Sequence, residues 1–177
     1  MPPEGLRIRR AEPDDYKALY EIFGGPKAFA GTLQLPYPSL EGWRKRLAEP
    51  PEGLYNIVAV VGERVVGMLG VHTFPNKPRR RHVGAVGIAV HDDWQGNGVG
   101  SALMRAGLDL ADNWLNLTRL TLEVYTDNEP AIRLYERFGF EREGTLRQDA
   151  FREGRYVDSY TMARLRPAAA PDGVRRP

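Results

Sequence analysis

The sequence predicts an α+β protein built on a mixed, mostly antiparallel β-sheet that helices flank. Two observations predict this class. Helix-like segments fill the N-terminal part of the chain, and from about residue 55 the apolar residues alternate as they do in strands. The strand-like segments in the middle follow one another through short turns, without the intervening helices of a doubly wound fold.

The N-terminal part is expected to hold one strand and two helices. Residues 6–10 read as the strand, and residues 12–23 as a helix that Gly24 and Gly25 end. Residues 40–48 predict the second helix, which stops before Pro50 and Pro51. The segment GTLQLPYPS, residues 31–39, connects the helices.

The middle of the chain predicts three strands. Residues 55–61 and 64–74 flank Gly62 and Glu63, which is the pattern of a hairpin with a two-residue turn. Residues 82–90 form the third strand, after a basic turn that is expected to be solvated. These strands should therefore be neighbours in the sheet.

The C-terminal part predicts two helices and three further strands. A long helix over residues 98–115 is indicated by one apolar face made of Leu103, Ala106, Leu110, Trp114 and Leu117. Residues 119–125 alternate as a strand, and a short helix follows Asn128 and ends at Gly139. Residues 150–156 and 157–165 read as a closing strand pair. One domain over residues 1–166 is expected, with residues 167–177, rich in Pro and Ala, as a disordered tail.

Composition excludes several classes of function. The chain has 25 basic and 23 acidic residues, a formal charge of +2, which is too balanced for a broad nucleic-acid-binding face. It has no cysteine, so disulfides, cysteine metal sites and a cysteine nucleophile are excluded. The three histidines lack the spacing of a zinc motif, so no metal is expected. The longest apolar run, residues 57–61, is far too short for a membrane span, and the cytoplasm is the expected compartment.

Three glycines precede the long helix in the segment WQGNGVGSALM, residues 94–104. A helix N-terminus offers free N–H groups, and it binds phosphates best where side chains are absent. The Walker pattern is excluded because no Lys-Ser or Lys-Thr follows, and the spacing differs from Gly-x-Gly-x-x-Gly. The observed pattern is Gln95-x-x-Gly98-x-Gly100. Taken alone, the loop could equally be a tightly packed helix start.

This pattern resembles the acyl-CoA signature of the GNAT N-acetyltransferases. A second block, LTLEVYTDNEPAIRLYERFGFEREG at residues 120–144, is similar to the family motif that contains an Asn, an Ala-Ile-x-x-Tyr helix and a Gly-Phe turn. The segments TLQLPYPS, PRRRHVG and GRYVDSYTMA also resemble the bacterial L-amino-acid N-acetyltransferases for L-phenylalanine and L-methionine. The resemblance covers nearly the whole chain.

The resemblance implies the GNAT fold, with a twisted sheet splayed at the cofactor site, and acetyl-CoA as cofactor. The backbone of the strand end would then hold the pantetheine, and the glycine segment would hold the pyrophosphate. Splayed strands leave backbone groups unpaired, and amides of the cofactor would pair with them. The implied cofactor-binding residues are Ile88, Ala89, Val90, Gln95, Gly96, Asn97, Gly98, Val99, Gly100, Ser101, Asn128 and Ala131.

The family's reaction is direct attack of a neutral amine on the thioester, which needs a base for the ammonium and an acid for the thiolate. Tyr135 matches the family's tyrosine and is the expected acid; the alternative is packing near Phe138. Glu123 is the expected base, as in some N-terminal acetyltransferases of the family. The alternatives for Glu123 are a structural ion pair or an outward position, and ordered water could serve as base. Asn128 could bind cofactor, cap its helix, or do both.

The expected acceptor is a small-molecule amine, namely the α-amine of a free apolar L-amino acid. Thr32, Leu33, Gln34 and Tyr37 are the candidate acceptor residues, although their segment could also be a packed connection between helices. An N-terminal protein acetyltransferase and a non-catalytic acyl-CoA-binding module are the rival functions. No nucleic-acid or membrane partner is expected, and many relatives suggest a homodimer.

Overall fold

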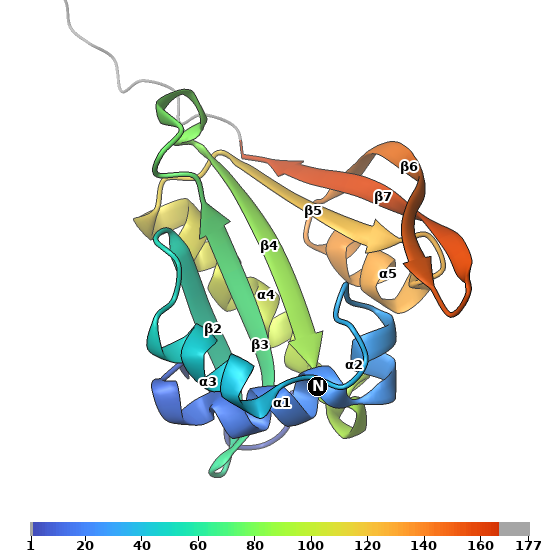
Figure 1. The fold of residues 1–177 in the computed structure, drawn as a ribbon. Helices are drawn as coiled ribbons and strands as arrows, with labels where there is room; N and C mark the ends of the chain where they lie inside the picture. Colours follow the sequence, from blue (N-terminus) through green and yellow to red (C-terminus); the bar gives the residue numbers. More distant parts are fainter. Residues whose placement is uncertain (1, 167–177) are drawn as a thin grey trace, which may run out of the picture.

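The computed structural model describes residues 2–166, so the tail predicted at residues 167–177 lies outside the described residues. Seven strands form one sheet in the order β1-β2-β3-β4-β5-β7-β6 (Figure 1). All neighbours are antiparallel except β4 and β5, which are parallel. The strands are β1 (Leu6–Arg10), β2 (Leu54–Val61), β3 (Arg64–Thr73), β4 (Val83–Val90), β5 (Arg119–Tyr125), β6 (Glu141–Arg152) and β7 (Arg155–Leu165).

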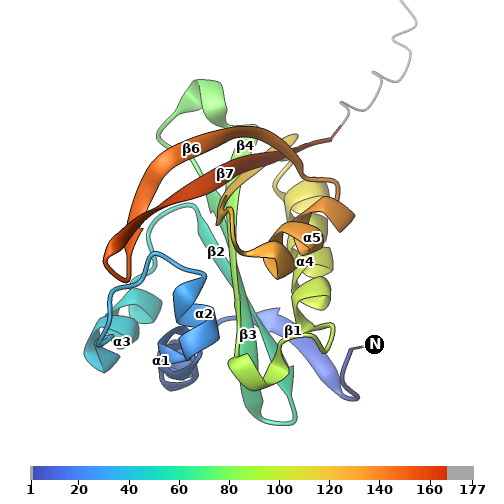
Figure 2. The same ribbon diagram turned by 90° about the vertical axis from the view of Figure 1, so that its right-hand side faces the viewer.

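Helices cover both faces of this sheet. In Figure 2, α1 to α3 lie on one face, and α4 and α5 lie on the other. The helices are α1 (Tyr16–Gly24), α2 (Pro26–Ala30), α3 (Leu40–Ala48), α4 (Val99–Asp109) and α5 (Glu129–Arg137); 3₁₀ turns span Pro13–Asp15, Pro78–Arg80 and Asp92–Trp94. One apolar core lies under α4 and α5 and a second under α1 and α3. None of the helices between residues 2 and 166 has the length and apolar character that a bilayer crossing requires.

The sheet splits where its two parallel strands meet. β4 and β5 are paired only from Val83 opposite Arg119 to Ala85 opposite Thr121. Beyond these residues the strands diverge, which is plain in Figure 1. The rest of β4 therefore has no strand partner on its β5 side, and a gap opens through the sheet. This confirms the predicted mixed, splayed α+β sheet.

Most predicted elements are present, with one unexpected helix near the N-terminus. The strand at 6–10 and the helix at 40–48 begin and end as predicted, whereas the helix predicted from residue 12 starts as a 3₁₀ turn. The short helix α2 was not predicted. Its first N–H groups, those of Lys27 and Ala28, each donate 2.9 Å to the carboxylate of Asp92. Because the capping residue is distant in the chain, the local sequence contains no N-cap pattern that would predict α2.

The end of the long helix differs from the prediction. The segment from Leu110 to Trp114 winds as a π-helical turn, which shifts the side chains that follow around the axis. Ala111 is buried as a result, and Trp114, predicted on the core face, is 76% exposed. The prediction for Trp114 is therefore wrong.

The closing strand pair is longer than predicted, and its turn lies elsewhere. The turn is formed by Glu153 and Gly154, inside the segment that was expected to be a single strand. β6 begins already at Glu141. It is exposed along most of its length and carries two register shifts, so no alternation of buried side chains marks it in the sequence.

Candidate active site

Two cavities lie beside the gap between β4 and β5. The α4 cavity, of about 1310 Å³, is lined by the strand end of β4, the start of α4 and α5. The α3 cavity, of about 520 Å³, is lined by α3, the middle of the sheet and the segment after α2. The cavities meet at the gap, and the residues that line both are Gly31, Thr32, Ile88, Glu123, Val124 and Tyr135. Both predicted catalytic residues therefore stand at this junction.

The N-terminus of α4 presents unpaired backbone donors to the α4 cavity. The first hydrogen bond of the helix runs from the N–H of Ala102 to the carbonyl of Gly98, at 3.0 Å. The N–H groups of Val99, Gly100 and Ser101 therefore have no partner within the helix, and no side chain from residues 2–166 caps them. Together with the positive end of the helix dipole, they form a binding place for an anion.

The glycines of this loop have more than one physical cause. Gly96 and Gly98 both have φ of +77°, a conformation that other residues rarely adopt. At Gly100 a Cβ atom would lie 3.2 Å from Cδ2 of Leu134 in α5, so close packing also favours glycine there. The alternative of a tightly packed helix start thus holds for Gly100 alongside its position on the cavity wall.

The predicted cofactor residues gather at the α4 cavity with two exceptions. Asn97 is exposed and does not line the cavity, and the side chain of Val99 is buried in the core. The side chain of Gln95 donates to the carbonyl of Val90 at 3.1 Å, so it also braces the loop. Asn128 caps α5 by accepting from the N–H of Ala131 at 3.3 Å. Four cationic side chains that were not predicted also line this cavity: Lys27, Arg105, Arg133 and Arg137.

Tyr135 reaches the junction from the α5 side of the sheet. It is only 6% exposed, and its ring lies 6.0 Å from that of Phe140, centroid to centroid. Burial raises the pKa of its phenol to about 12. The hydroxyl is therefore protonated at neutral pH and can act as a proton donor toward the gap.

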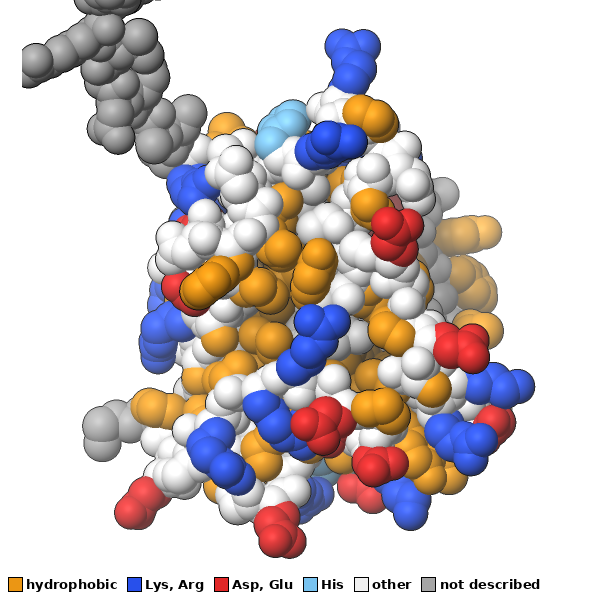
Figure 3. Space-filling view, turned by 90° about the vertical axis from the view of Figure 1, so that its left-hand side faces the viewer, with side chains coloured by type: hydrophobic (Ala, Val, Ile, Leu, Met, Phe, Trp, Pro, Cys, Tyr) orange, Lys and Arg blue, Asp and Glu red, His pale blue; other side chains and the backbone are white. Residues whose placement is uncertain are grey.

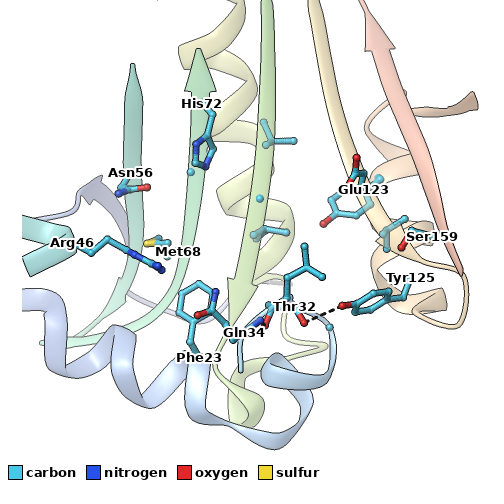
Figure 4. A pocket seen from close by; sticks show the side chains of 18 of the residues that line it. Phe23, Thr32, Gln34, Arg46, Asn56, Met68, His72, Glu123, Tyr125 and Ser159 are labelled. Atoms are coloured by element: carbon cyan, nitrogen blue, oxygen red, sulfur yellow. Dashed lines mark hydrogen bonds between the residues drawn. The ribbon is translucent and has the colours of Figure 1, made fainter. Parts of the chain in front are cut away.

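Glu123 lies on the opposite side of the junction. It is exposed and, like Tyr125 two residues further on, belongs to the β5 face that looks toward α3. Figure 4 shows its side chain at the gap between β4 and β5. Within residues 2–166 it forms no ion pair, so the alternative of a structural ion pair finds no support here.

The floor of the α3 cavity is bare of side chains at its centre. Gly70 of β3 and Gly87 of β4 are directly paired, and both line the cavity. A Cβ atom at Gly87 would meet nothing within 4 Å, so the space above it is open. Asn56 stands opposite Gly70 on β2, and Glu123 lines the cavity from β5, across the gap that opens after Ala85 and Thr121. An acceptor can therefore lie across the strands between these two polar side chains.

The walls of the α3 cavity differ in character from end to end. Phe23, Trp43, Leu47 and Met68 make the end below α3 apolar. Arg46 of α3 extends over Met68 at this end (Figure 4), and its guanidinium lies 4.8 Å from the centroid of the Trp43 ring. Asp149, with Glu123, gives the opposite end negative charge. His72 also lines the cavity, and burial lowers the pKa of its imidazole.

The predicted acceptor segment contributes three of its four candidates. Thr32, Leu33 and Gln34 line the α3 cavity, whereas Tyr37 is 97% exposed and lies outside it. The start of this segment is tied to β5, because the hydroxyl of Tyr125 donates to the carbonyl of Thr32 at 3.2 Å (Figure 4). Arg152 of β6 holds the end of α2 as well, by donating to the carbonyl of Ala30 at 3.0 Å. The segment is thus part of the cavity wall and more than a connection.

Sequence reasoning missed much of the α3 cavity. Arg46, Gly87, Asp149 and His72 belong to no motif, and they come together only through the pairing of distant strands and the packing of α3 beside the sheet. Alternation along β3 places Met68, Gly70 and His72 on one face, but the sequence does not show that this face is hollow. The basic turn at 79–81 lines neither cavity. On the side shown in Figure 3, basic and acidic side chains are interspersed around an apolar area, as on an ordinary solvated surface.

Most of the chain matches a known protein family. Residues 16–140 match the model described as the acetyltransferase (GNAT) family. This stretch begins with α1 and ends just after α5, so it contains the gap, the glycine loop and both residues at the junction.

Known proteins of similar sequence transfer acetyl groups to amines. The chain is 45% identical over 159 residues to the Escherichia coli L-amino acid N-acetyltransferase AaaT, covering 90% of this chain and 97% of that protein. It is 38% identical over 161 residues to the Vibrio cholerae spermidine N(1)-acetyltransferase, covering 89% and 91%. Among solved structures, the Sinorhizobium meliloti phosphinothricin acetyltransferase in complex with acetyl-CoA has a TM-score of 0.80 at 22% identity, over 91% of this chain and 88% of that chain.

Proposed function

The chain belongs to the GNAT family of N-acetyltransferases, and from this premise we propose that it acetylates the α-amine of free L-amino acids such as L-phenylalanine and L-methionine. The observation that carries the proposal is the junction of two cavities at a gap in the sheet. One cavity suits a phosphate-bearing thioester and the other a small amine. The reacting atoms would meet between Glu123 and Tyr135.

The α4 cavity fits acetyl-CoA, which supplies an acetyl group activated as a thioester. The free N–H groups of Val99, Gly100 and Ser101 would bind the pyrophosphate, and Lys27 and Arg105 add positive charge nearby. Ile88 to Val90 would bind the pantetheine through backbone groups that β5 leaves unpaired. Val99 would contribute its N–H group alone, and Asn97, which lies outside the cavity, would contribute no contact.

Two residues would move protons on opposite sides of the gap. Glu123, on the acceptor side, would take the proton of the incoming ammonium, directly or through ordered water. Tyr135, on the α5 side, would donate its hydroxyl proton to the departing thiolate. The chain has no cysteine, so attack on the thioester in a ternary complex is favoured over an acetyl-enzyme.

The α3 cavity favours a small acceptor. Its volume of about 520 Å³ is in the range of small-molecule sites. Its apolar end suits the side chain of phenylalanine or methionine, and the name of the E. coli relative supports amino acids as the class. Polyamines are the second candidate, since the V. cholerae relative is a spermidine acetyltransferase and Glu123 and Asp149 would attract a cationic substrate.

A mass-spectrometric screen tests this function. The purified protein is incubated with acetyl-CoA and single acceptors: the L-amino acids, spermidine, L-phenylalanine amide and a peptide that begins with phenylalanine. We expect N-acetylation of L-phenylalanine and L-methionine at higher kcat/KM than the amide and the peptide. Preference for the peptide would replace the proposal with a protein acetyltransferase, and preference for spermidine with a polyamine enzyme. The cytoplasmic location and the homodimer stay predictions.

A further inference from the structure

We propose that Arg46 of α3 binds the carboxylate of the acceptor and so makes the enzyme selective for free amino acids. This inference rests on the proposed function and names the residue that recognises its substrate class. Among the described residues, Arg46 is the only Lys or Arg side chain that lines the α3 cavity. It forms no ion pair within residues 2–166, so its donors are available to a ligand.

The position of Arg46 is set by packed neighbours. Trp43 and Leu47, on the same helix, are buried in the core below α3. The guanidinium stacks on the Trp43 ring at 4.8 Å, and Figure 4 shows it directed over Met68 into the cavity. Stacking of this kind orients the planar group, and a planar guanidinium can bind both oxygens of a carboxylate. An arginine oriented by a buried tryptophan of the same helix is well suited to recognise a small ligand.

The charged side chains of the α3 cavity are arranged to match the two charged groups of a free amino acid. Glu123 and Asp149 stand at the β5 side, where the amine must lie to meet the thioester. Arg46 stands on the far wall, across the bare strip of Gly70 and Gly87. A zwitterion fits this order with its ammonium toward Glu123 and its carboxylate toward Arg46. A polyamine would bring a second positive charge toward Arg46, which is unfavourable.

Other cationic groups are less suited to this role. Arg152, which holds the end of α2, is paired with Asp127. His72 lies within the cavity, but burial lowers the pKa of its imidazole and so favours the neutral form. Arg46 therefore supplies the positive charge of the α3 cavity at neutral pH.

The test compares Arg46→Met with the matched variant Arg44→Met on two acceptors, L-phenylalanine and L-phenylalanine amide. Arg44 is on the same helix but faces Glu41, at 3.3 Å, and does not line the cavity. We expect Arg46→Met to lower kcat/KM for the free acid by about 10–100-fold, the usual worth of a hydrogen bond to a charged group, with little effect on the amide. Arg44→Met should leave both unchanged. Arg46→Lys should fall between, since it keeps the charge but loses the planar fork.

Three results would overturn the assignment. An equal loss on acid and amide would mean that Arg46 only packs against Trp43. An unchanged preference for the acid in folded Arg46→Met would place carboxylate recognition elsewhere, while the proposed function stood. Gained spermidine activity without loss on L-phenylalanine would mean that Arg46 only excludes cations. If the wild type acetylates no amino acid at all, the proposed function itself has failed.

Discussion

The hydroxyl of Tyr135 is needed for its proposed catalytic role but not for a packing role, so removing it distinguishes the two. Tyr135→Phe keeps the ring and its contact with Phe140 and removes only the proton donor. Because general acid catalysis contributes about 10²–10⁴-fold, we expect kcat to fall within that range while the Kd of acetyl-CoA changes little. Steady-state rates and calorimetric titration measure the two quantities. Turnover at the wild-type rate would assign Tyr135 to packing.

The pKa of Tyr135 also predicts how activity responds to alkaline pH. Burial raises this pKa to about 12 from an ordinary 10.0, so the phenol keeps its proton well beyond neutral pH. We therefore expect no fall in kcat from loss of this proton up to about pH 10. The measurement is kcat against pH at saturating substrates, with Tyr135→Phe as control. A decline centred below pH 9 in the wild type and absent from the variant would contradict the assignment.

At the scale of residues, what could be predicted depended on local motifs. Tyr135 and Glu123 lie within one continuous block that resembles a family motif, and the structure brings both to the junction. Tyr37 belonged to a less specific resemblance, and the structure leaves it outside the cavity. Arg46 carries no local signal, since an arginine on a short amphipathic helix looks like any solvated side chain until the cavity beside it is known.

At the scale of elements, the start of α4 can be tested without disturbing the fold. Ser101 is in the first turn and lines the α4 cavity. Ser101→Glu adds a negative charge near the positive end of the helix dipole, which stabilises the folded protein by about 0.3–1 kcal/mol. The melting temperature should therefore stay the same or rise. The same charge would repel a pyrophosphate, so the Kd of acetyl-CoA should rise by about tenfold or more.

The control for this variant is Ser101→Gln, which has similar size and no charge. Calorimetric titration with acetyl-CoA and thermal unfolding are measured on both variants. Unchanged affinity for acetyl-CoA in folded Ser101→Glu would contradict the proposal that the pyrophosphate binds at the N-terminus of α4.

The floor of the α3 cavity predicts acceptor size. Gly87 has open space where its side chain would be, so Gly87→Val should fold and place three carbons inside the cavity. We expect kcat/KM for L-phenylalanine to fall by at least about tenfold, since pocket contacts of one methylene already discriminate by such factors. L-alanine should be affected much less. Gly144→Val, at an exposed strand position outside the cavity, is the matched control. An equal effect on both acceptors would contradict the role of Gly87.

Elements were predictable where their own side chains fix them. The β2–β3 hairpin has alternating apolar residues and a two-residue turn, and its structure matches the prediction closely. α2 could not be predicted, because Asp92, which follows β4 and is distant in the chain, caps it. The exposure of the Trp114 side chain depends on a π-helical turn, and the regular period of an α-helix does not predict such a turn.

At the scale of the whole molecule, the function depends on the two halves of one sheet diverging after Ala85 and Thr121. The gap lets a group bound on the α4 side reach a group bound on the α3 side, between Glu123 and Tyr135. The sequence predicted this gap only through the family resemblance. The pairing that ends at Ala85 and Thr121 is a contact between distant segments, and nothing local in either strand marks where it stops.

A bisubstrate analogue tests this account most directly. In this compound, the nitrogen of L-phenylalanine is joined through an acetyl unit to the sulfur of coenzyme A, so one molecule spans both cavities. Linked groups that bind together gain about 10²–10⁴-fold in affinity, and we therefore expect the analogue to bind at least about a hundredfold more tightly than coenzyme A alone. Calorimetric titration gives both Kd values. A Kd equal to that of coenzyme A would show that the amino acid does not occupy the α3 cavity when the cofactor is bound, and would contradict the account.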